Sequence, residues 1–270
     1  MLFGFCMGIG FVKGDVASRT IFDAVCASGY DYVELHLSAL AALTDAEFAA
    51  LKAELDEKNM PMRACCIFFP PEVALVGPKQ DLAEIRAYAE HALSRAKKLG
   101  AETAVFGNGG ARKVPDDMSH EAAFDDLRRV AEVLDEVAGT HGITITVEPL
   151  NQKETNIILC FKDAVALAHG LTHVTAMCDW YHMVAEGDTM DAPLSEPDQM
   201  QHLHIARPDV RMIPAPTDEL SEYADFVKAI KFMGYDKKLS VEGRLAATEP
   251  AAIHDEIRAC LAVLRQLFND

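Results

Sequence analysis

Four residues that can bind a metal ion stand at the ends of four consecutive apolar segments of the 270-residue chain. They are Glu148, Asp179, His204 and Glu242. Three carboxylates gathered at one point of low dielectric would repel one another, and a divalent cation removes that repulsion. Oxygen and imidazole donors suit Mn²⁺, Mg²⁺ or Co²⁺, with Zn²⁺ as an alternative. One charged residue after a strand usually opens a solvated loop, but four in succession predict a site for one divalent ion.

These four segments belong to a regular alternation of two kinds of sequence. Short runs rich in β-branched and aromatic residues alternate with longer stretches of helical periodicity. The short runs are Leu2–Met7, Tyr32–Leu35, Met62–Phe68, Thr103–Phe106, Ile143–Glu148, Val174–Asp179, His202–Ile205 and Leu239–Glu242. Helices are predicted after Thr44 and over Asp81–Leu99, Ser119–Val137, Phe161–His169, Tyr223–Met233 and Pro250–Phe268.

Eight strand–helix units in about 250 residues predict an α/β fold, a (β/α)8 TIM barrel, as one domain over residues 1–270. An open doubly wound sheet alternates in the same way, but the strand number and chain length favour the closed barrel. The C-terminal ends of barrel strands open on one face, so the four ligand residues would meet there. His202 and His204 lie two apart and face the same side of their strand. We expect His204, nearer the rim, to be the ligand and His202 to pack beneath it, although the two could exchange roles.

The composition excludes several other classes of protein. The formal net charge is −17, which opposes binding to phosphate backbones and to anionic membranes. No nucleic-acid partner and no membrane partner is therefore expected, although the charge does not name a substrate. Seven cysteines without a C-x-x-C motif predict reduced thiols, and the apolar N-terminus lacks an export signal, so a cytoplasmic location is expected. No interface signal decides whether the chain forms a homo-oligomer.

The motifs around the four ligand residues resemble the xylose isomerase-like TIM-barrel superfamily. They read Glu148-Pro-Leu-Asn151-Gln-Lys-Glu154-Thr-Asn156, Asp179-Trp-Tyr-His182-Met, His202-Leu-His204-Ile and Val241-Glu242-Gly. Within the superfamily, the resemblance is greatest to the ketose 3-epimerases of the tagatose and psicose type and to the hydroxypyruvate isomerases. It covers essentially the whole chain, and its motifs are specific for the superfamily but much less so for the substrate.

The resemblance implies a role for each of the four ligand residues. Glu148, Asp179, His204 and Glu242 would hold one Mn²⁺ or similar ion. Glu148 and Glu242 would also act as the catalytic acid and base, on opposite faces of the substrate.

Further residues would contact the substrate. The resemblance implies that His182 and Glu154 hydrogen-bond substrate oxygens and that an arginine after the seventh strand does likewise. Arg211 is the first candidate for this arginine and Arg207 the rival. Relatives often carry an acidic residue at the position of Arg207, so this departure suggests a carboxylate or phosphate on the substrate.

Some side chains near the strand ends have two interpretations. Phe68 and Trp180 could form an apolar wall around the substrate or could simply pack in the core. The loop that begins at Gly107 would shape the mouth of the barrel, with Arg112 as a weaker candidate for binding an anionic group. His36 follows the second strand, where a solvated or capping role is favoured over contact with the site.

The predicted chemistry is proton transfer next to a carbonyl group. A cation bound to the carbonyl oxygen would stabilise the enediolate, so that a carboxylate base can work near neutral pH. Return of the proton to the opposite face gives epimerisation, and return to the adjacent carbon gives aldose–ketose isomerisation. The sequence therefore predicts a sugar isomerase or epimerase, similar to ketose 3-epimerase or hydroxypyruvate isomerase, that acts on a small ketose or hydroxy-keto acid.

Three other functions fit the same sequence less well. A metal-dependent lyase acting on keto-sugars would need the same metal and base and stays a serious alternative. DNA repair of the endonuclease-IV type would require extra histidine ligands for three zinc ions and a basic face, which the net charge opposes. A non-catalytic sugar-binding protein would not need the complete set of four ligand residues.

Overall fold

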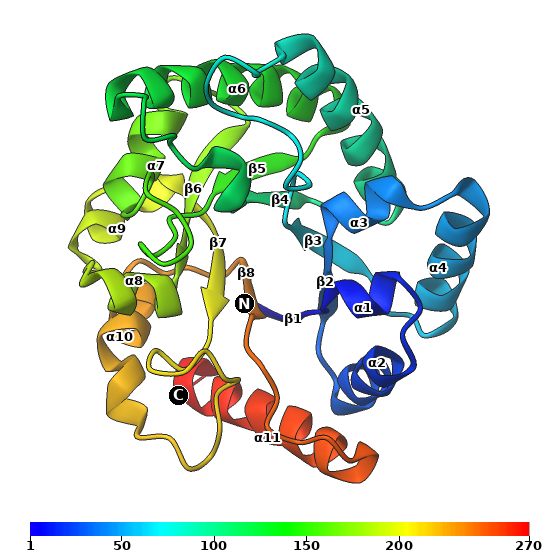
Figure 1. Ribbon diagram of the computed structural model, residues 1–270. Coiled ribbons are helices and arrows are strands. Elements are labelled where there is room, and N and C mark those ends of the chain that lie inside the picture. Colours follow the sequence, from blue (N-terminus) through cyan, green and yellow to red (C-terminus); the bar gives the residue numbers. More distant parts are fainter. Residues whose placement is uncertain (270) are drawn as a thin grey trace.

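All eight predicted strands form, and each pairs in parallel with its neighbours in sequence order. The computed structural model describes residues 1–269, and its strands close into a barrel surrounded by helices (Figure 1). The strands are β1 (Leu2–Cys6), β2 (Tyr32–His36), β3 (Met62–Cys66), β4 (Thr103–Phe106), β5 (Thr144–Val147), β6 (Val174–Asp179), β7 (Met200–Ile205) and β8 (Lys238–Val241). Pairing of Leu2 with Lys238 and of Phe5 with Val241 joins β8 to β1 and closes the ring. The predicted (β/α)8 barrel is thus confirmed.

The helices form the outer ring, and all six predicted ones are present. The main helices are α2 (Val16–Ser28), α4 (Asp45–Glu57), α5 (Leu82–Lys98), α6 (His120–His141), α7 (Phe161–Ala168), α8 (Trp180–Glu186), α10 (Ala224–Phe232) and α11 (Pro250–Asn269). Short helices are α1 (Ile9–Val12), α3 (Leu37–Ala42) and α9 (Asp191–Ser195), with 3-10 turns at Gly110–Arg112, Pro197–Gln199 and Leu220–Tyr223. Along the described chain, no helix is long and apolar enough to span a bilayer.

Helix α2 was not predicted, although it begins and ends with typical capping residues. The Asp15 side chain accepts a hydrogen bond from the Ser18 backbone, and Gly29 ends the helix at a φ of 86°. Several β-branched residues within the helix, among them Val16 and Ile21, lower its intrinsic helix propensity. Its stability therefore comes from packing against the barrel and α11, which the local sequence does not reveal.

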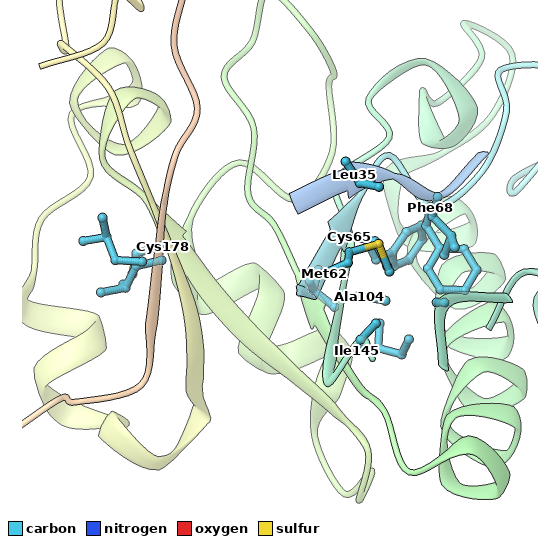
Figure 2. Packing of buried hydrophobic residues seen from close by; sticks show 14 of the residues in the cluster. Leu35, Met62, Cys65, Phe68, Ala104, Ile145 and Cys178 are labelled. Carbon is cyan, nitrogen blue, oxygen red and sulfur yellow. The ribbon is translucent and has the colours of Figure 1, made fainter. Parts of the chain in front are cut away.

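The hydrophobic core lies between the strands and the helix ring. Figure 2 shows Leu35, Met62, Ala104 and Ile145 from adjacent strands packed together, all fully buried. Phe68 belongs to this core, since its ring lies 4.7 Å from that of Phe69 and is completely covered. Of the two interpretations of Phe68, core packing is correct and the substrate wall is wrong.

The barrel interior contains polar side chains as well as apolar ones. A Cβ atom at Gly4 would lie only 2.2 Å from the Tyr32 ring, so glycine at this position gives the ring its space inside the barrel. The Tyr32 hydroxyl lies 2.8 Å from Ser240 Oγ, and Glu34 and His202 are fully buried beside them. A polar layer therefore lies directly beneath the barrel mouth.

Candidate active site

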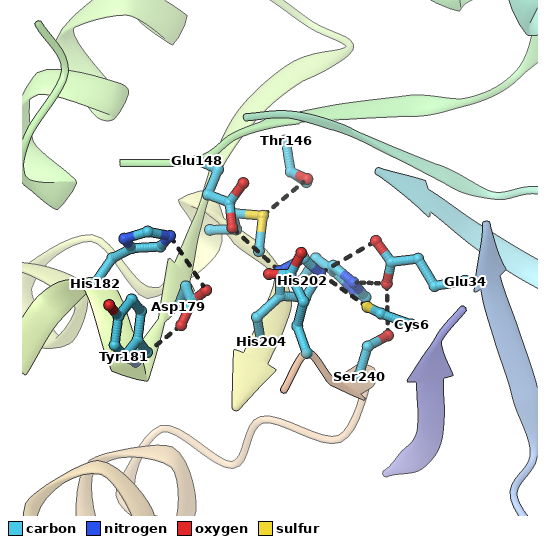
Figure 3. A network of polar contacts seen from close by, with 12 residues as sticks. Cys6, Glu34, Thr146, Glu148, Asp179, Tyr181, His182, His202, His204 and Ser240 are labelled. Carbon is cyan, nitrogen blue, oxygen red and sulfur yellow. Dashed lines mark hydrogen bonds and ion pairs between the residues drawn. The ribbon is translucent and has the colours of Figure 1, made fainter. Parts of the chain in front are cut away.

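The structure brings the four predicted ligand residues to one point at the barrel mouth. Figure 3 shows three of them, Glu148, Asp179 and His204. Each of Glu148, Asp179, His204 and Glu242 offers one oxygen or nitrogen atom, and these atoms lie within 4.8 Å of one another. Glu148 directly follows β5 and Glu242 directly follows β8, while Asp179 and His204 belong to β6 and β7. Strand pairing therefore fixes all four backbones, as the sequence predicted.

The two nitrogen atoms of His204 face different carboxylates. Its Nδ1 atom lies 3.1 Å from Glu148 Oε1 and 3.0 Å from Glu242 Oε2. Its Nε2 atom lies 3.1 Å from Glu34 Oε1, in the layer beneath. His202 Nε2 also faces Glu34, at 2.8 Å from Oε2. Of the two histidines, His204 is thus the one that joins the ligand cluster, and His202 packs beneath it.

The cluster carries buried negative charge that the protein only partly compensates. Asp179 is 1% exposed, and its Oδ2 atom has no hydrogen-bond partner within residues 1–269. Burial raises the pKa of Asp179 to about 6 and also raises the pKa of Glu148. Burial opposes ionisation of Glu242 too, but His204 and Arg211 outweigh it and hold the pKa of Glu242 well below its usual range. An unpaired buried oxygen among carboxylate and imidazole donors fits a divalent cation.

His182 presents a hydrogen-bond donor to the same point. Its Nδ1 atom accepts a hydrogen bond from the Asn151 backbone nitrogen at 3.1 Å and lies 2.9 Å from Asn151 Nδ2. In the neutral ring the proton must then be on Nε2, because a nitrogen that accepts carries none. That Nε2 atom is buried, finds no hydrogen-bond acceptor in the described part of the chain, and lies 3.7 Å from Asp179 Oδ2. The donor is free for a substrate oxygen.

The structure distinguishes the two candidate arginines. Arg211 lies at the cluster, with Nη1 2.8 Å from Glu154 Oε1 and Nη2 2.9 Å from Glu242 Oε2. Arg207 instead forms an ion pair with Asp218, at 3.3 Å. Asp218 neutralises the charge of Arg207. Arg207 therefore does not add an unpaired positive charge at the barrel mouth.

Two other side chains pack into the framework around the site. Trp180 stacks on Phe226 with ring centres 5.2 Å apart, and its indole nitrogen donates to the Glu222 carbonyl oxygen at 3.1 Å. Arg112 is completely buried and donates to the Phe106 carbonyl at 3.1 Å and to the Glu148 carbonyl at 2.6 Å. Of the two interpretations of Trp180, core packing is the one that the structure favours, and Arg112 binds backbone carbonyls instead of lying free for an anionic group.

A small cavity opens beside the cluster. Its volume is about 240 Å³, and its lining includes Cys6, His36, Arg211 and Glu242. His36 occupies the N-cap position of helix α3 but makes no side-chain capping hydrogen bond, and its partly exposed side chain lines this cavity. Of the two favoured roles, side-chain capping is thus absent and a partly solvated position is what the structure shows. The cavity size suits a small molecule such as a monosaccharide.

Two further residues shape the cluster: Glu34, which the sequence did not indicate, and Gly107, which was expected only as part of a loop at the barrel mouth. Glu34 is fully buried in β2, where a carboxylate in the middle of the apolar run Tyr32–Leu35 was the only available signal. Gly107 follows β4, and a Cβ atom there would lie 1.8 Å from Glu148 Oε2. Glycine at this position therefore leaves the space that the Glu148 carboxylate occupies.

Known proteins with related sequences or structures are sugar epimerases or share their fold. The chain is 29% identical over 148 residues to 3-dehydro-D-guloside 4-epimerase of Escherichia coli (strain K12), and this match spans 54% of each protein. The D-psicose 3-epimerase of Clostridium cellulolyticum H10, solved with D-tagatose, superposes with a TM-score of 0.80 at 19% identity over 99% of both chains. A zinc-bound IOLI protein superposes with a TM-score of 0.74 at 16% identity, over 99% of this chain and 98% of that one.

A family model describes nearly the whole length of the sequence. It is the xylose isomerase-like TIM barrel model, and it matches residues 22–266. The match includes all four clustered ligand residues, His182 and Arg211. The chain belongs to the xylose isomerase-like TIM barrel family.

Proposed function

We propose that the protein is a divalent-metal-dependent isomerase or epimerase that moves a proton next to the carbonyl of a small ketose or hydroxy-keto acid. The observation that carries this proposal is the convergence of Glu148, Asp179, His204 and Glu242, with ligand atoms within 4.8 Å of one another. Asp179 adds support, because its buried Oδ2 atom accepts no hydrogen bond among the described residues and has only the Arg211 Nη2 atom, 3.8 Å away, as a partial compensation of its charge.

These four residues would hold one ion, for which Mn²⁺ is the first choice. Carboxylate oxygens and a single imidazole also suit Mg²⁺ and Co²⁺, and Zn²⁺ stays an alternative. When bound, the ion would supply positive charge beside the substrate carbonyl, which makes the neighbouring proton more acidic. The zinc-bound IOLI protein supports a divalent ion in this fold.

Glu148 and Glu242 are the proposed acid and base. They enter the cluster from β5 and β8, so their carboxylates approach the bound substrate from different strands. One carboxylate removes the proton, and the other returns a proton to the opposite face or to the adjacent carbon. Both side chains lie within 3.1 Å of His204 Nδ1, which limits their movement.

Three further side chains would orient the substrate. His182 directs its Nε2 proton at the cluster and donates to a substrate oxygen. Glu154 and Arg211, which form an ion pair at 2.8 Å, would bind hydroxyl groups further from the reacting carbon. The cavity of about 240 Å³ favours a monosaccharide-sized partner, in line with the D-tagatose bound to the psicose epimerase.

The test is proton exchange in D₂O, followed by NMR over a panel of ketoses and hydroxy-keto acids. We expect deuterium to enter next to the carbonyl of at least one substrate and an epimer or isomer to accumulate. Dialysis against a chelator should abolish both signals, and Mn²⁺ should restore them. Exchange that persists in the metal-free protein would refute the metal mechanism, and a dehydrated product would identify a lyase instead.

A further inference from the structure

We propose that Glu34 is a positioning residue for the metal site. Glu34 accepts a hydrogen bond from the Nε2–H group of His204. This bond fixes the orientation of the ring and the tautomer that presents Nδ1 to the divalent ion. This inference rests on the proposed function, because it concerns how one ligand of that ion is held.

The first support is the set of three hydrogen bonds that the Glu34 carboxylate accepts. Its Oε1 atom lies 3.1 Å from His204 Nε2, and its Oε2 atom lies 2.8 Å from His202 Nε2. The Ser240 hydroxyl donates to the same Oε2 atom at 2.6 Å. An ionised carboxylate can only accept hydrogen bonds, so both histidine nitrogens that face it must carry protons.

The second support is the consequence for His204. When its ring is neutral, the single N–H is on Nε2, and the lone pair is on Nδ1. That Nδ1 atom faces Glu148 and Glu242 at 3.1 Å and 3.0 Å, which is where the proposed ion would lie. The opposite tautomer would place two acceptors face to face at Glu34 and would block Nδ1 with a proton. Glu34 therefore selects the tautomer that can bind a metal.

The third support is the rigid attachment of Glu34 itself. The side chain is fully buried, and Ser240, which donates to it, has its own Oγ 2.8 Å from the Tyr32 hydroxyl. Tyr32 in turn fills the space that Gly4 leaves inside the barrel. Because the Ser240 hydroxyl donates its hydrogen bond to Glu34, the Tyr32 hydroxyl must be the donor in its contact with Ser240. The direction of each hydrogen bond in this chain is thus determined, and Glu34 cannot rotate without breaking several of them.

Glu34 does not act as a ligand or catalytic group in this arrangement. Its two oxygens already accept from His202, His204 and Ser240, and its side chain is 0% exposed. A substrate at the barrel mouth would meet Glu148 and Glu242 first. The effect of Glu34 on the reaction therefore passes through His204.

The test compares Mn²⁺ affinity in the wild-type protein and in Glu34→Gln, measured from the electron paramagnetic resonance signal of free Mn²⁺. Glutamine keeps the shape of the side chain, but its amide N–H₂ group cannot accept a hydrogen bond. It would therefore face at least one of the groups that donate to Glu34, which are His202, His204 and Ser240, without bonding to it. We expect Mn²⁺ to bind about 10- to 100-fold more weakly in Glu34→Gln. Glu57→Gln, which removes the same charge from the exposed surface of α4, should bind Mn²⁺ as the wild type does. Circular dichroism in the presence of a chelator establishes that each variant is folded.

A second measurement does not depend on any variant. NMR of isotope-labelled histidines in the Mg²⁺-loaded wild type should place the His204 proton on Nε2. A proton on Nδ1 would overturn the inference, as would a Glu34→Gln protein that binds Mn²⁺ with wild-type affinity. A wild type that binds no divalent ion would refute the proposed function and the inference together, whereas binding that is equal in both proteins would remove only the role of Glu34.

Discussion

The barrel interior holds two polar layers, one at the rim and one directly beneath it, which satisfy their hydrogen bonds differently. In the rim layer, Asp179 Oδ2 and His182 Nε2 are buried and find no hydrogen-bond partner among residues 1–269. In the lower layer, His202 Nδ1 also lacks a partner among these residues, but both oxygens of Glu34 and the Ser240 hydroxyl are paired. Buried groups left unpaired are costly and point to a ligand, whereas saturated groups stabilise and orient their neighbours. The comparison predicts that rim substitutions change chemistry and that substitutions in the supporting residues change position or stability.

The largest effect is expected for a rim residue. Glu242→Gln keeps the size of the side chain but cannot transfer a proton, so turnover should fall by about 10²- to 10⁴-fold. The measurement is deuterium uptake from D₂O into the best substrate of the panel, with the melting temperature measured alongside. Glu249→Gln, an exposed substitution in the same segment, is the control. Near-normal exchange in Glu242→Gln would remove it from the acid–base pair and weaken the distinction between the layers.

Gly107→Ala tests whether the rim depends on space as well as on charge. The new Cβ atom would displace the Glu148 carboxylate, which lies 1.8 Å from its position. Misplacement of a reacting group by about 1 Å can cost up to roughly 100-fold, so we expect a 10- to 100-fold loss of turnover. Gly110→Ala is the matched control, because a Cβ atom there meets no other described atom within 4 Å. Equal activity of both variants would show that Glu148 moves without consequence.

Arg112→Met should change stability more than chemistry. It removes the donor to the buried Glu148 carbonyl oxygen, while the Phe106 carbonyl oxygen keeps its bond from the Glu148 backbone nitrogen. We expect this to lower the free energy of unfolding by about 1–3 kcal/mol. Urea unfolding monitored by circular dichroism measures this difference. The exposed neighbour provides a control, since Lys113→Met should change stability by less than about 0.5 kcal/mol. A variant as stable as the wild type would contradict the supporting role of Arg112.

The smallest expected effect is the release of protons when the metal binds. Burial opposes protonation of His204, but Glu34 and Glu242 outweigh it and hold the pKa of His204 well above its usual range. This shift favours a proton on Nδ1 in the metal-free protein, so binding of Mn²⁺ should release protons into solution. Affinity should rise with pH, because fewer protons then compete with the metal. A pH indicator in weakly buffered solution measures the release, and its absence would argue against His204 as a ligand.

The sequence predicted the rim layer better than the layer that supports it. Glu148 and Glu242 follow strand-like runs, and strand ends in a barrel share one face, so local pattern and fold together place them. Glu34 contacts residues that lie far away along the chain, including Ser240 on β8, so periodicity carried no information about its partners. The packing of Trp180 on Phe226 likewise joins two helices of the outer ring. Long-range contacts of this kind depend on the complete tertiary structure rather than on any segment.

Strand β8 both closes the barrel against β1 and supplies the last member of the cluster. Synthesis proceeds from the N-terminus, so Glu242 is the last of the four ligand residues to be made. A chain that ends before β8 would contain Glu148, Asp179 and His204 but could neither close the ring against β1 nor supply Glu242. In the proposed enzyme, completion of the fold and completion of the catalytic centre thus depend on the same last strand.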